Sequence, residues 1–361
     1  MYKGKSIGVV VTAYDEDAFV GRVIETVPAF VDRIYVVDDA SPDDCWDVIE
    51  RVAARINEGE SAEPERAVAD GGDGRRVVPI RHDENRGYGG AVKTGYERAV
   101  DDGIDVVAVM NGDGQMDPAI LDRIVDPVVD GEADYAKGNR LLTPEDRASM
   151  STFRFVGNAM LTGLSKFATG YWTMSDPQNG YTAISREAID ELDLESITDN
   201  YGFLNHVLTH LNVNEFRVVD VPMTAVYGDE TSSIGYPSFV KFVSLLLLRS
   251  FLWRLKTRYV VRTFHPAVVF YGAGTAGLLG GALGLVGSLA RRVRGVESFT
   301  PAVASFVAFL VGTVALGVAI WLDAEENAHL EVTRYEHDAA DERTSERPAG
   351  QFEEPAPQSV D

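Results

Sequence analysis

The segment Asp105-Val-Val-Ala-Val-Met-Asn-Gly-Asp-Gly-Gln-Met-Asp-Pro118 decides how the first part of this chain folds. Its apolar run, residues 106–110, predicts a buried strand. The run stops at a glycine-punctuated turn that carries Asp113, Gln115 and Asp117. Carboxylate and amide oxygens at the carboxyl end of a strand suit a hard divalent cation, and such a cation suits a diphosphate. The same residue types also build ordinary surface turns, so the segment alone indicates either a metal site or a turn.

Other short apolar runs alternate with amphipathic stretches through residues 1–235. The runs that predict strands are 7–11, 33–37, 77–80 and 106–110, and the stretches that predict helices include 18–27 and 90–100. This alternation predicts an α/β domain with a mostly parallel sheet, whose sites lie at the carboxyl ends of the strands. Residues 57–75, rich in Glu, Ala, Gly and Asp, are expected to form a solvated insertion without chemistry.

The composition limits the setting in which the protein works. The net charge is −23, from 56 acidic and 33 basic residues, and this acidic, lysine-poor balance is typical of proteins from salt-accumulating halophiles. It also excludes nucleic acid as an expected partner, because phosphate backbones attract the opposite charge. Cys45 is the only cysteine, so no intrachain disulfide forms and a reducing cytoplasm is expected. The N-terminus runs directly into the first predicted strand, so we expect no signal peptide.

The segment after the α/β domain is basic in an otherwise acidic chain. Residues 238–262 combine leucines and aromatic residues with six cations. We expect residues 236–264 to form an amphipathic helix that lies on anionic lipid, with an ordinary core helix as the alternative.

Two uncharged stretches follow within residues 265–323. Residues 267–290 and 298–322 each exceed the about 20 residues that a helix needs to cross a bilayer. The six cations before them outnumber the three arginines between them, so the positive-inside rule predicts a membrane protein with two spans and a cytoplasmic N-terminal domain. The acidic tail, residues 324–361, is expected to be disordered.

The first of these stretches contains a misleading motif. Gly272-Ala-Gly-Thr-Ala-Gly277 matches a dinucleotide-binding fingerprint, but it continues into uncharged sequence and not into a second strand with an acidic end. Small residues four apart, such as Gly277 and Gly281, instead let transmembrane helices approach closely. A homo-oligomer formed through this glycine-rich helix is therefore a further expectation.

Three more segments follow or include the ends of predicted strands. Each alone could be an ordinary turn, and only the set of segments indicates a protein family. They are Gly8 to Glu16, Tyr35 to Asp44 and the glycine-rich Asn85 to Gly95. With the Asn-Gly-Asp-Gly-Gln turn, their order and spacing resemble the family 2 glycosyltransferases, whose catalytic domain binds nucleotide sugars on a Rossmann-like sheet of the GT-A type.

Downstream motifs narrow the resemblance to the dolichol- and polyprenol-phosphate hexosyltransferases. These motifs lie at residues 137–140, 154–166, 175–186, 201–203, 219–222 and 227–232. The resemblance covers roughly residues 5–235, and the two apolar stretches match the membrane-anchored members. There are two departures. The first strand ends Thr12-Ala-Tyr-Asp-Glu16 where the family has Pro-Ala-Tyr-Asn-Glu, and Asn111 replaces the first Asp of the family's Asp-x-Asp motif, which is expected to weaken metal or ribose contact.

The resemblance implies transfer of a hexose from UDP- or GDP-hexose to dolichyl or polyprenyl phosphate, with inversion and with Mg²⁺ or Mn²⁺. The product would supply lipid-linked sugar for protein or surface glycosylation. A phosphate monoester is already ionised at pH 7, so its attack needs no general base. The alternatives are a transferase acting on another lipid-linked acceptor, a non-catalytic membrane scaffold, and a polysaccharide synthase, although the Gln-x-x-Arg-Trp signature of such synthases is missing.

The resemblance and the chemistry of the residues together give a set of candidate site residues. The nucleotide-sugar site is expected to contain Ala13, Tyr14, Glu16, Asp39, Gly87, Gly90, Lys93 and Asn111. The metal is expected on Asp113 and Gln115, with catalytic roles for Asp113 and for Asp176, which would position the sugar or acceptor. The acceptor phosphate is expected on Arg140, Arg154 and Asn158, since guanidinium groups bind phosphate by charge-assisted hydrogen bonds.

Overall fold

An eight-stranded sheet organises the computed structural model, which describes residues 1–60, 74–142, 152–223, 236–295 and 299–333. The strands follow the order β3-β2-β1-β4-β6-β5-β7-β8 across the sheet. Their bounds are β1 (Ile7–Ala13), β2 (Arg33–Asp38), β3 (Val77–Arg81), β4 (Val106–Asn111), β5 (Tyr135–Asn139), β6 (Thr182–Ser185), β7 (Val218–Pro222) and β8 (Glu331–Val332). The motif at 227–232 and most of the predicted insertion lie outside the described residues.

The sheet is mostly parallel, as predicted. Strand β6 pairs antiparallel with β4 and β5, and the other pairs are parallel. The four predicted strands are β1 to β4, each of which runs one or two residues longer than predicted. The register pairs Thr12 with Asn111 and Ala13 with Asp38, so the carboxyl ends of β1, β2 and β4 lie side by side. This is the edge at which open α/β sheets bind ligands.

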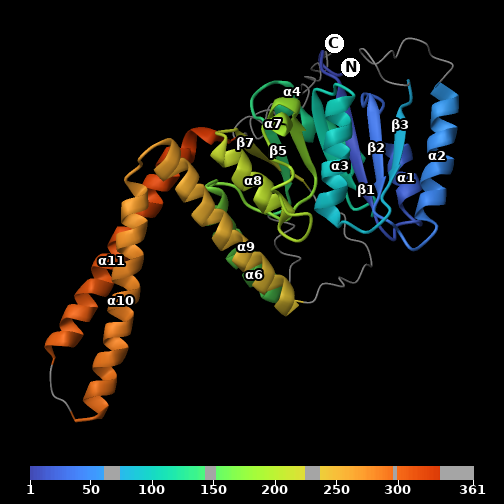
Figure 1. The fold of residues 1–361 in the computed structure, drawn as a ribbon. Coiled ribbons are helices and arrows are strands. Elements are labelled where there is room, and N and C mark those ends of the chain that lie inside the picture. Colours follow the sequence, from blue (N-terminus) through green and yellow to red (C-terminus); the bar gives the residue numbers. More distant parts are fainter. Residues whose placement is uncertain (61–73, 143–151, 224–235, 296–298, 334–361) are drawn as a thin grey trace, which may run out of the picture.

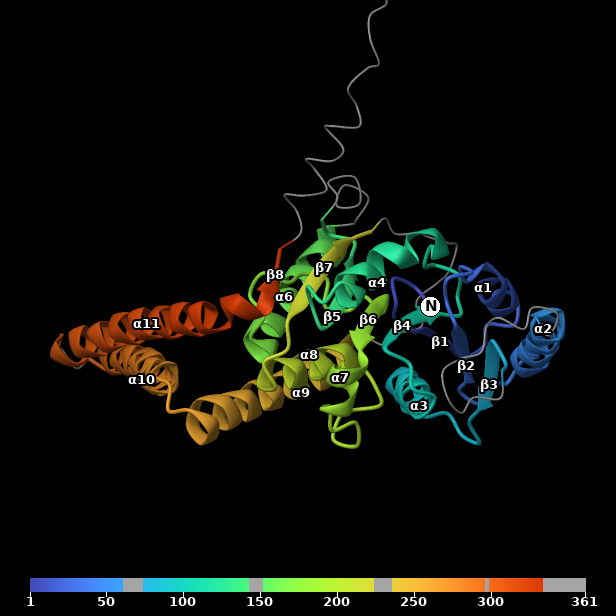
Figure 2. The same ribbon diagram turned by 90° about the horizontal axis from the view of Figure 1, so that it is seen from above.

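Helices cover both faces of the sheet (Figures 1 and 2). Helices α1 (Val20–Thr26), α2 (Cys45–Glu60) and α4 (Leu121–Val129) cover one face, where Val9, Val11 and Ile34 lie in the core. Helices α3 (Tyr88–Asp101), α7 (Arg186–Asp190) and α8 (Phe203–Val213) cover the other face, where Val10, Tyr35 and Val37 are buried. The alternation follows from the two-residue period of strands, and runs buried on both faces are typical of parallel sheets.

Helices α6 (Thr152–Thr169) and α9 (Tyr236–Lys256) pack on each other beside α8. After a π-helical turn, Thr257–Arg262, the chain enters α10 (Ala267–Val293) and α11 (Thr300–Asn327). These two helices form a long hairpin that points away from the sheet (Figure 1). Each is long and apolar enough to cross a membrane. In the most apolar stretch of each helix, at most 17% is buried inside the protein. A core helix of a soluble protein would be buried, so the exposure favours lipid as the surroundings.

Glycines bring α10 and α11 into close contact. A Cβ added to Gly277 would lie 2.9 Å from the Cα of Gly312, and one on Gly281 would clash with the backbone of Phe309. The small residues that suggested a homo-oligomer therefore pack inside one chain, as small residues do between transmembrane helices. The oligomer stays a prediction without this support.

The structure corrects three expectations about domain limits and charge. Helix α2 continues through Glu60, so residues 57–60 belong to it and not to the insertion. The tail does not begin as a disordered segment at residue 324, because α11 continues to Asn327 and residues 331–332 join the sheet as β8. The rest of the tail, from residue 334, lies outside the described residues.

The third correction concerns the basic segment. Arg254 and Arg258 are buried, and both side chains bond to protein groups instead of facing lipid. Arg249 and Lys256 are exposed, as expected for cations near a lipid surface. Large apolar side chains of α9 are also exposed, among them Phe242, Leu245, Leu248 and Leu252. An apolar face is thus available for lipid, with fewer cations beside it than the sequence suggested.

Candidate active site

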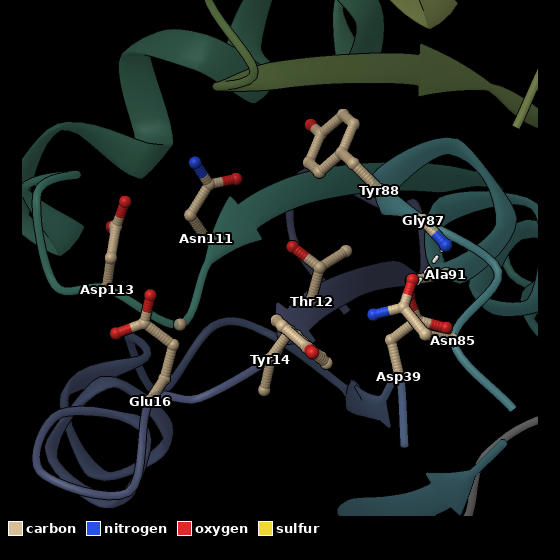
Figure 3. Close-up of a pocket in the computed structure, with 12 residues that line it drawn as sticks. Thr12, Tyr14, Glu16, Asp39, Asn85, Gly87, Tyr88, Ala91, Asn111 and Asp113 are labelled. Carbon is tan, nitrogen blue, oxygen red and sulfur yellow. Dashed lines mark hydrogen bonds between the residues drawn. The ribbon is translucent and has the colours of Figure 1, made fainter. Parts of the chain in front are cut away.

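A cavity of about 290 Å³ opens at the carboxyl ends of β1, β2 and β4. Its walls come from four segments that the sequence had singled out, and the lining residues are Thr12, Ala13, Tyr14, Glu16, Asp39, Asn85, Gly87, Tyr88, Ala91, Asn111, Gly112 and Asp113. Seven predicted site residues are among them: Ala13, Tyr14, Glu16, Asp39, Gly87, Asn111 and Asp113. In Figure 3, Asp113 and Glu16 lie at one end of the cavity, and Asp39, Asn85 and Gly87 lie at the other.

The turns around the cavity hold unusual backbone conformations. Asp15, just after β1, has a φ of 61°, and Ala40, just after β2, has a φ of 57°. Residues with side chains adopt this left-handed region at a cost, so it persists where surrounding contacts fix it, often at functional sites. At the end of β4 the amide of Gly112 donates to the carbonyl of Thr12 (2.8 Å), and a Cβ there would lie 2.9 Å from that oxygen. The Asn-Gly-Asp turn therefore needs a glycine at this position.

The end of the cavity near β4 offers oxygen donors to a cation. The side-chain oxygen of Asn111 is buried and has no hydrogen-bond partner among the described residues. The carboxylate of Asp113 lines the same cavity, and one of its oxygens accepts a hydrogen bond from the amide of Gln115 (2.9 Å). Among the residues that the structure describes, no three His, Cys, Asp or Glu side chains cluster to hold a metal alone. An orphaned amide oxygen beside a carboxylate fits a hard divalent cation that takes further ligands from a bound molecule.

Asp117, the last acidic residue of the turn, caps a helix and does not contribute to the cavity. Its carboxylate accepts a hydrogen bond from the amide of Ala119 (2.9 Å) and so caps the short helical turn that begins at Pro118. It does not line the cavity. An Asp before a Pro at the first helical position is a common helix start.

Asp39 holds the glycine-rich loop at the opposite end. One carboxylate oxygen accepts from the amide of Arg86 (2.8 Å) and lies 2.7 Å from Nδ1 of His82. The other oxygen accepts from the amide of Gly87 (2.7 Å), a contact drawn in Figure 3. The carboxylate is thus at once part of the cavity wall and the clamp that sets the position of the loop beside it.

Gly90 and Lys93, two predicted site residues on α3, are not brought to the cavity. A Cβ on Gly90 would lie 2.6 Å from Cβ of Arg86, and one on the neighbouring Gly89 would lie 2.8 Å from the carbonyl of Asp199. The ammonium of Lys93 is buried and pairs with the carboxylate of Asp199 (2.7 Å). The glycine-rich entry of α3 therefore serves largely to pack this helix against the segment before α8.

A second polar cluster lies beside the cavity and unites the downstream motifs. The buried ammonium of Lys137 pairs with Asp220 (2.9 Å) and donates to the carbonyls of Ser175 (2.6 Å) and Asp176 (3.0 Å). Asp220 also accepts from the amide of Ser175 (2.8 Å). Residues from β5, β7 and the loop before β6 thus form one network, which explains why charged residues occur inside these strands.

Asp176 and Arg140 form an ion pair within this cluster. Two nitrogens of the Arg140 guanidinium donate to the two oxygens of Asp176 at 2.8 and 2.9 Å. Asp176 has a φ of 52° and is buried. Burial by itself would raise the pKa of Asp176, but the hydrogen bonds and charge of Arg140, with the charge of Lys137, outweigh it and hold the pKa below its ordinary value.

For the other two predicted acceptor residues, Arg154 and Asn158, the structure describes the position in the fold but not the side chain. Arg154 and Asn158 lie on helix α6, but their side chains fall outside the described residues. Helix α6 ends at Thr169, at the start of the loop that carries Asp176.

Tyr88 lines the cavity as well, although its role was not predicted from the sequence. Its hydroxyl donates to the carbonyl of Gly180 (3.4 Å), and burial raises its pKa, so it stays neutral. A Cβ on Gly180 would lie 2.6 Å from this hydroxyl and 3.4 Å from the side-chain oxygen of Asn111. The loop that carries Asp176 therefore reaches the cavity at Gly180. The sequence signal that could have identified Tyr88 as a cavity residue is its position directly after Gly87 in the glycine-rich segment.

The family of the chain follows from comparison with known proteins. The model of glycosyl transferase family 2 matches residues 8–193, which contain β2 to β6, all of β1 except Ile7, and every residue that lines the cavity. The chain therefore belongs to glycosyl transferase family 2.

Relatives of known name share this domain. The UDP-N-acetylglucosamine–dolichyl-phosphate N-acetylglucosaminyltransferase of Methanococcus voltae is 25% identical over 249 residues, which are 68% of this chain and 96% of that protein. The polyprenol monophosphomannose synthase of Mycolicibacterium smegmatis is 30% identical over 223 residues, 60% of this chain and 76% of that protein. Among solved structures, glucosyl-3-phosphoglycerate synthase from Mycobacterium tuberculosis, in complex with Mn²⁺, UDP and glucosyl-3-phosphoglycerate, matches with 18% identity and a TM-score of 0.45, over 70% of this chain and 80% of that chain.

Proposed function

We propose that this glycosyltransferase moves a hexose from UDP- or GDP-hexose to dolichyl or polyprenyl phosphate with inversion at the anomeric carbon. The observation that carries the proposal is the adjacency of two sites. Tyr88 and Asn111, which line the cavity at the ends of β1, β2 and β4, lie against Gly180 of the loop that carries Asp176, and Asp176 pairs with Arg140 at the end of β5. The names of the Methanococcus and Mycolicibacterium relatives support a lipid-phosphate acceptor.

The nucleotide is assigned to the cavity between Asp39 and Asp113. Tyr14, about half exposed at the cavity mouth, offers a ring on which a base can stack. The amides of the Arg86–Gly87 loop are held by Asp39, so nucleotide contacts from that side rest on a fixed backbone. Preorganised groups of this kind lower the cost of binding.

Mg²⁺ or Mn²⁺ is assigned to the end of the cavity near β4. Asp113 and the orphaned oxygen of Asn111, which line the cavity, would hold it. Gln115, the other ligand expected from the family resemblance, is not among the lining residues, although its backbone amide donates to Asp113 (2.9 Å). When bound, the cation would neutralise negative charge on the leaving nucleoside diphosphate. Asn111 supplies an oxygen without a charge, so binding depends more on Asp113 than in a site with two carboxylates.

The acceptor phosphate is assigned to the side of the cavity where Arg140 and Asp176 lie. The phosphate is ionised at neutral pH, so Asp176 need not take a proton from it. Its pKa lies below the ordinary range, which keeps it a carboxylate and suits it to orient Arg140. A phosphate oxygen that attacks in line, opposite the diphosphate, gives inversion.

The membrane part fits an acceptor that cannot leave its leaflet. We assign α10 and α11 as two spans and place the active site in the cytoplasm, with α9 lying along the bilayer surface. The exposed leucines of α9 supply the apolar face. At multimolar salt, which the acidic composition suggests as the native condition, this face contributes more than the cations because their attraction is screened.

A donor panel tests the proposal. Membranes containing the full chain are incubated with Mn²⁺, a short polyprenyl phosphate and UDP-glucose, UDP-N-acetylglucosamine or GDP-mannose in turn, and lipids are analysed by mass spectrometry. We expect one donor to yield a polyprenyl-phosphate sugar, and Asp113→Ala to lower the rate of its formation by about 10²-fold or more. Nucleotide binding without transfer to any acceptor would instead support the scaffold alternative.

A further inference from the structure

The strand that follows the membrane hairpin is tied to the loop that carries Asp176. Glu331, on β8, accepts hydrogen bonds from the amides of Trp172 (2.8 Å) and Thr173 (2.6 Å) and a further one from the hydroxyl of Thr173. These residues are separated from Glu331 by about 160 positions and by both apolar helices. A carboxylate that accepts several hydrogen bonds from one loop fixes the position of that loop.

Neighbouring strands hold this loop at successive residues. Glu331 on β8 binds the amides of Trp172 and Thr173, and Asp220 on β7 binds the amide of Ser175 (2.8 Å). The ammonium of Lys137 then binds the carbonyl of Asp176 (3.0 Å). These contacts fix the loop up to and including Asp176, whose backbone has a left-handed conformation that persists only where contacts enforce it.

The end of α11 is itself fixed to the catalytic domain. Asn327 accepts a hydrogen bond from the side-chain amide of Asn212 on α8 (2.8 Å) and another from Arg258 (2.8 Å). Leu330 is buried in the core under α8, and β8 pairs in parallel with β7, Glu331 opposite Val218. The chain from the end of α11 to Glu331 is therefore held against the catalytic domain through Asn327, Leu330 and β8.

We propose that Glu331 is a positioning residue for the lipid-phosphate acceptor, through which the membrane hairpin sets the loop that carries Asp176 and its partner Arg140. The proposal rests on the proposed function, which places the acceptor phosphate beside Arg140. A lipid phosphate is confined to the bilayer surface, and the hairpin defines the height of the domain above that surface. The chain that leaves the membrane also holds the loop that carries Asp176. The acceptor phosphate and this loop are therefore held at the same height relative to the bilayer surface.

The test uses the full-length protein in nanodiscs and compares Glu331→Ala and Glu331→Gln with Glu325→Gln. Glu325 is an exposed glutamate in the last turn of α11 and serves as the matched control. Amide hydrogen exchange of Trp172 and Thr173 is measured without substrates, and KM is measured for the nucleotide sugar and for polyprenyl phosphate.

In Glu331→Ala we expect exchange at both amides to accelerate about tenfold or more, the acceptor KM to rise about tenfold and the donor KM to change less than about twofold, because only acceptor-side hydrogen bonds are lost. Glu331→Gln should show the same pattern in weaker form, and Glu325→Gln should match the wild type. Unaltered exchange in Glu331→Ala, or an equal rise of both KM values, would overturn the inference. Absence of transfer by the wild type would refute the proposed function instead, and the exchange measurement would still decide whether Glu331 holds the loop.

Discussion

The guanidinium of Arg254 donates hydrogen bonds of 2.9 and 2.8 Å to the two carboxylate oxygens of Asp323, and neither side chain is exposed to solvent. Arg254 lies on α9 and Asp323 near the end of α11, so the pair joins α9 to the hairpin of α10 and α11. Its remaining groups are also satisfied: Arg254 donates to the carbonyls of Phe167 and Ala168 at the end of α6. Three helices thus meet at one buried charge pair.

Removal of one partner of this pair should destabilise the protein strongly. Arg254→Met leaves the carboxylate of Asp323 buried without a counter-charge, which should cost about 3–5 kcal/mol of unfolding free energy. The double variant Arg254→Met, Asp323→Leu should recover much of this loss because neither charge of the pair then remains buried. The midpoint of thermal unfolding in detergent measures both. A single variant as stable as the double variant would contradict the prediction.

Adjacent glycines on α10 provide a matched pair for testing how the hairpin packs. A methyl group on Gly281 would clash with the backbone of Phe309, whereas nothing lies within 4 Å of one on Gly280. Gly281→Ala should therefore lower stability by about 1–3 kcal/mol through overpacking. Gly280→Ala should be neutral or raise stability by up to about 1 kcal/mol, since alanine favours helix. Equal unfolding midpoints for the two variants would show that α10 and α11 do not pack as described.

Substitutions in the turn after β4 should separate metal binding from folding. Asp113→Ala should lower turnover by about 10²–10³-fold or more, the order seen when one electrostatic group of an active site is lost. Circular dichroism should be unchanged, because the side chain of Asp113 is at the cavity wall and outside the core. Asn111→Asp should keep or improve Mn²⁺ affinity, measured by metal titration of the activity. Full turnover in Asp113→Ala would remove this residue from the site.

The Asp176–Arg140 pair should make stability depend on pH in a defined direction. The pKa of Asp176 is lowered in the folded protein, so the carboxylate stabilises the fold above the ordinary pKa of about 3.9, and this contribution is lost as the pH falls through the folded value. Asp176→Asn, which keeps the shape, should be less stable than the wild type at pH 7. The difference in unfolding midpoint should shrink between about pH 4 and lower values. A difference that is constant over this range would argue against the ion pair.

The exposed leucines of α9 should matter for long acceptors only. Replacement of Leu245, Leu248 and Leu252 by Ser removes apolar contact with lipid, each worth about 1.5–3 kcal/mol when fully buried. We expect the KM for long polyprenyl phosphates to rise about tenfold, with little change for short soluble analogues. Trp253 is left unchanged because its ring stacks on His210 of α8 (4.5 Å between ring centroids). An equal effect on both acceptors would show that these leucines belong to the core.

Much of the catalytic domain was predictable because its signals are local. Apolar runs gave β1 to β4 within one or two residues, since a strand buried on both faces leaves a continuous pattern. The residues that follow those strands share one cavity because parallel strands bring their carboxyl ends to one edge. Lys93 was predicted to bind the nucleotide sugar, but it pairs with the carboxylate of Asp199. The sequence around a lysine in a glycine-rich helix entry does not distinguish these two partners.

By itself, the sequence determined the alternation of strands and helices, the two apolar helices long enough to cross a bilayer, and the turn around Asp113. Periodicity, uncharged length and turn residues are signals that act over a few neighbouring positions. Only the tertiary structure decided the partners of charges far apart in the chain. It buried Arg254 against Asp323 instead of exposing it to lipid, and it added Glu331 to the sheet beneath the loop of Asp176. The physical reason is that neighbouring positions in the sequence do not indicate which opposite charge will pair with a buried charge. The partner is set only when segments distant in the chain pack together.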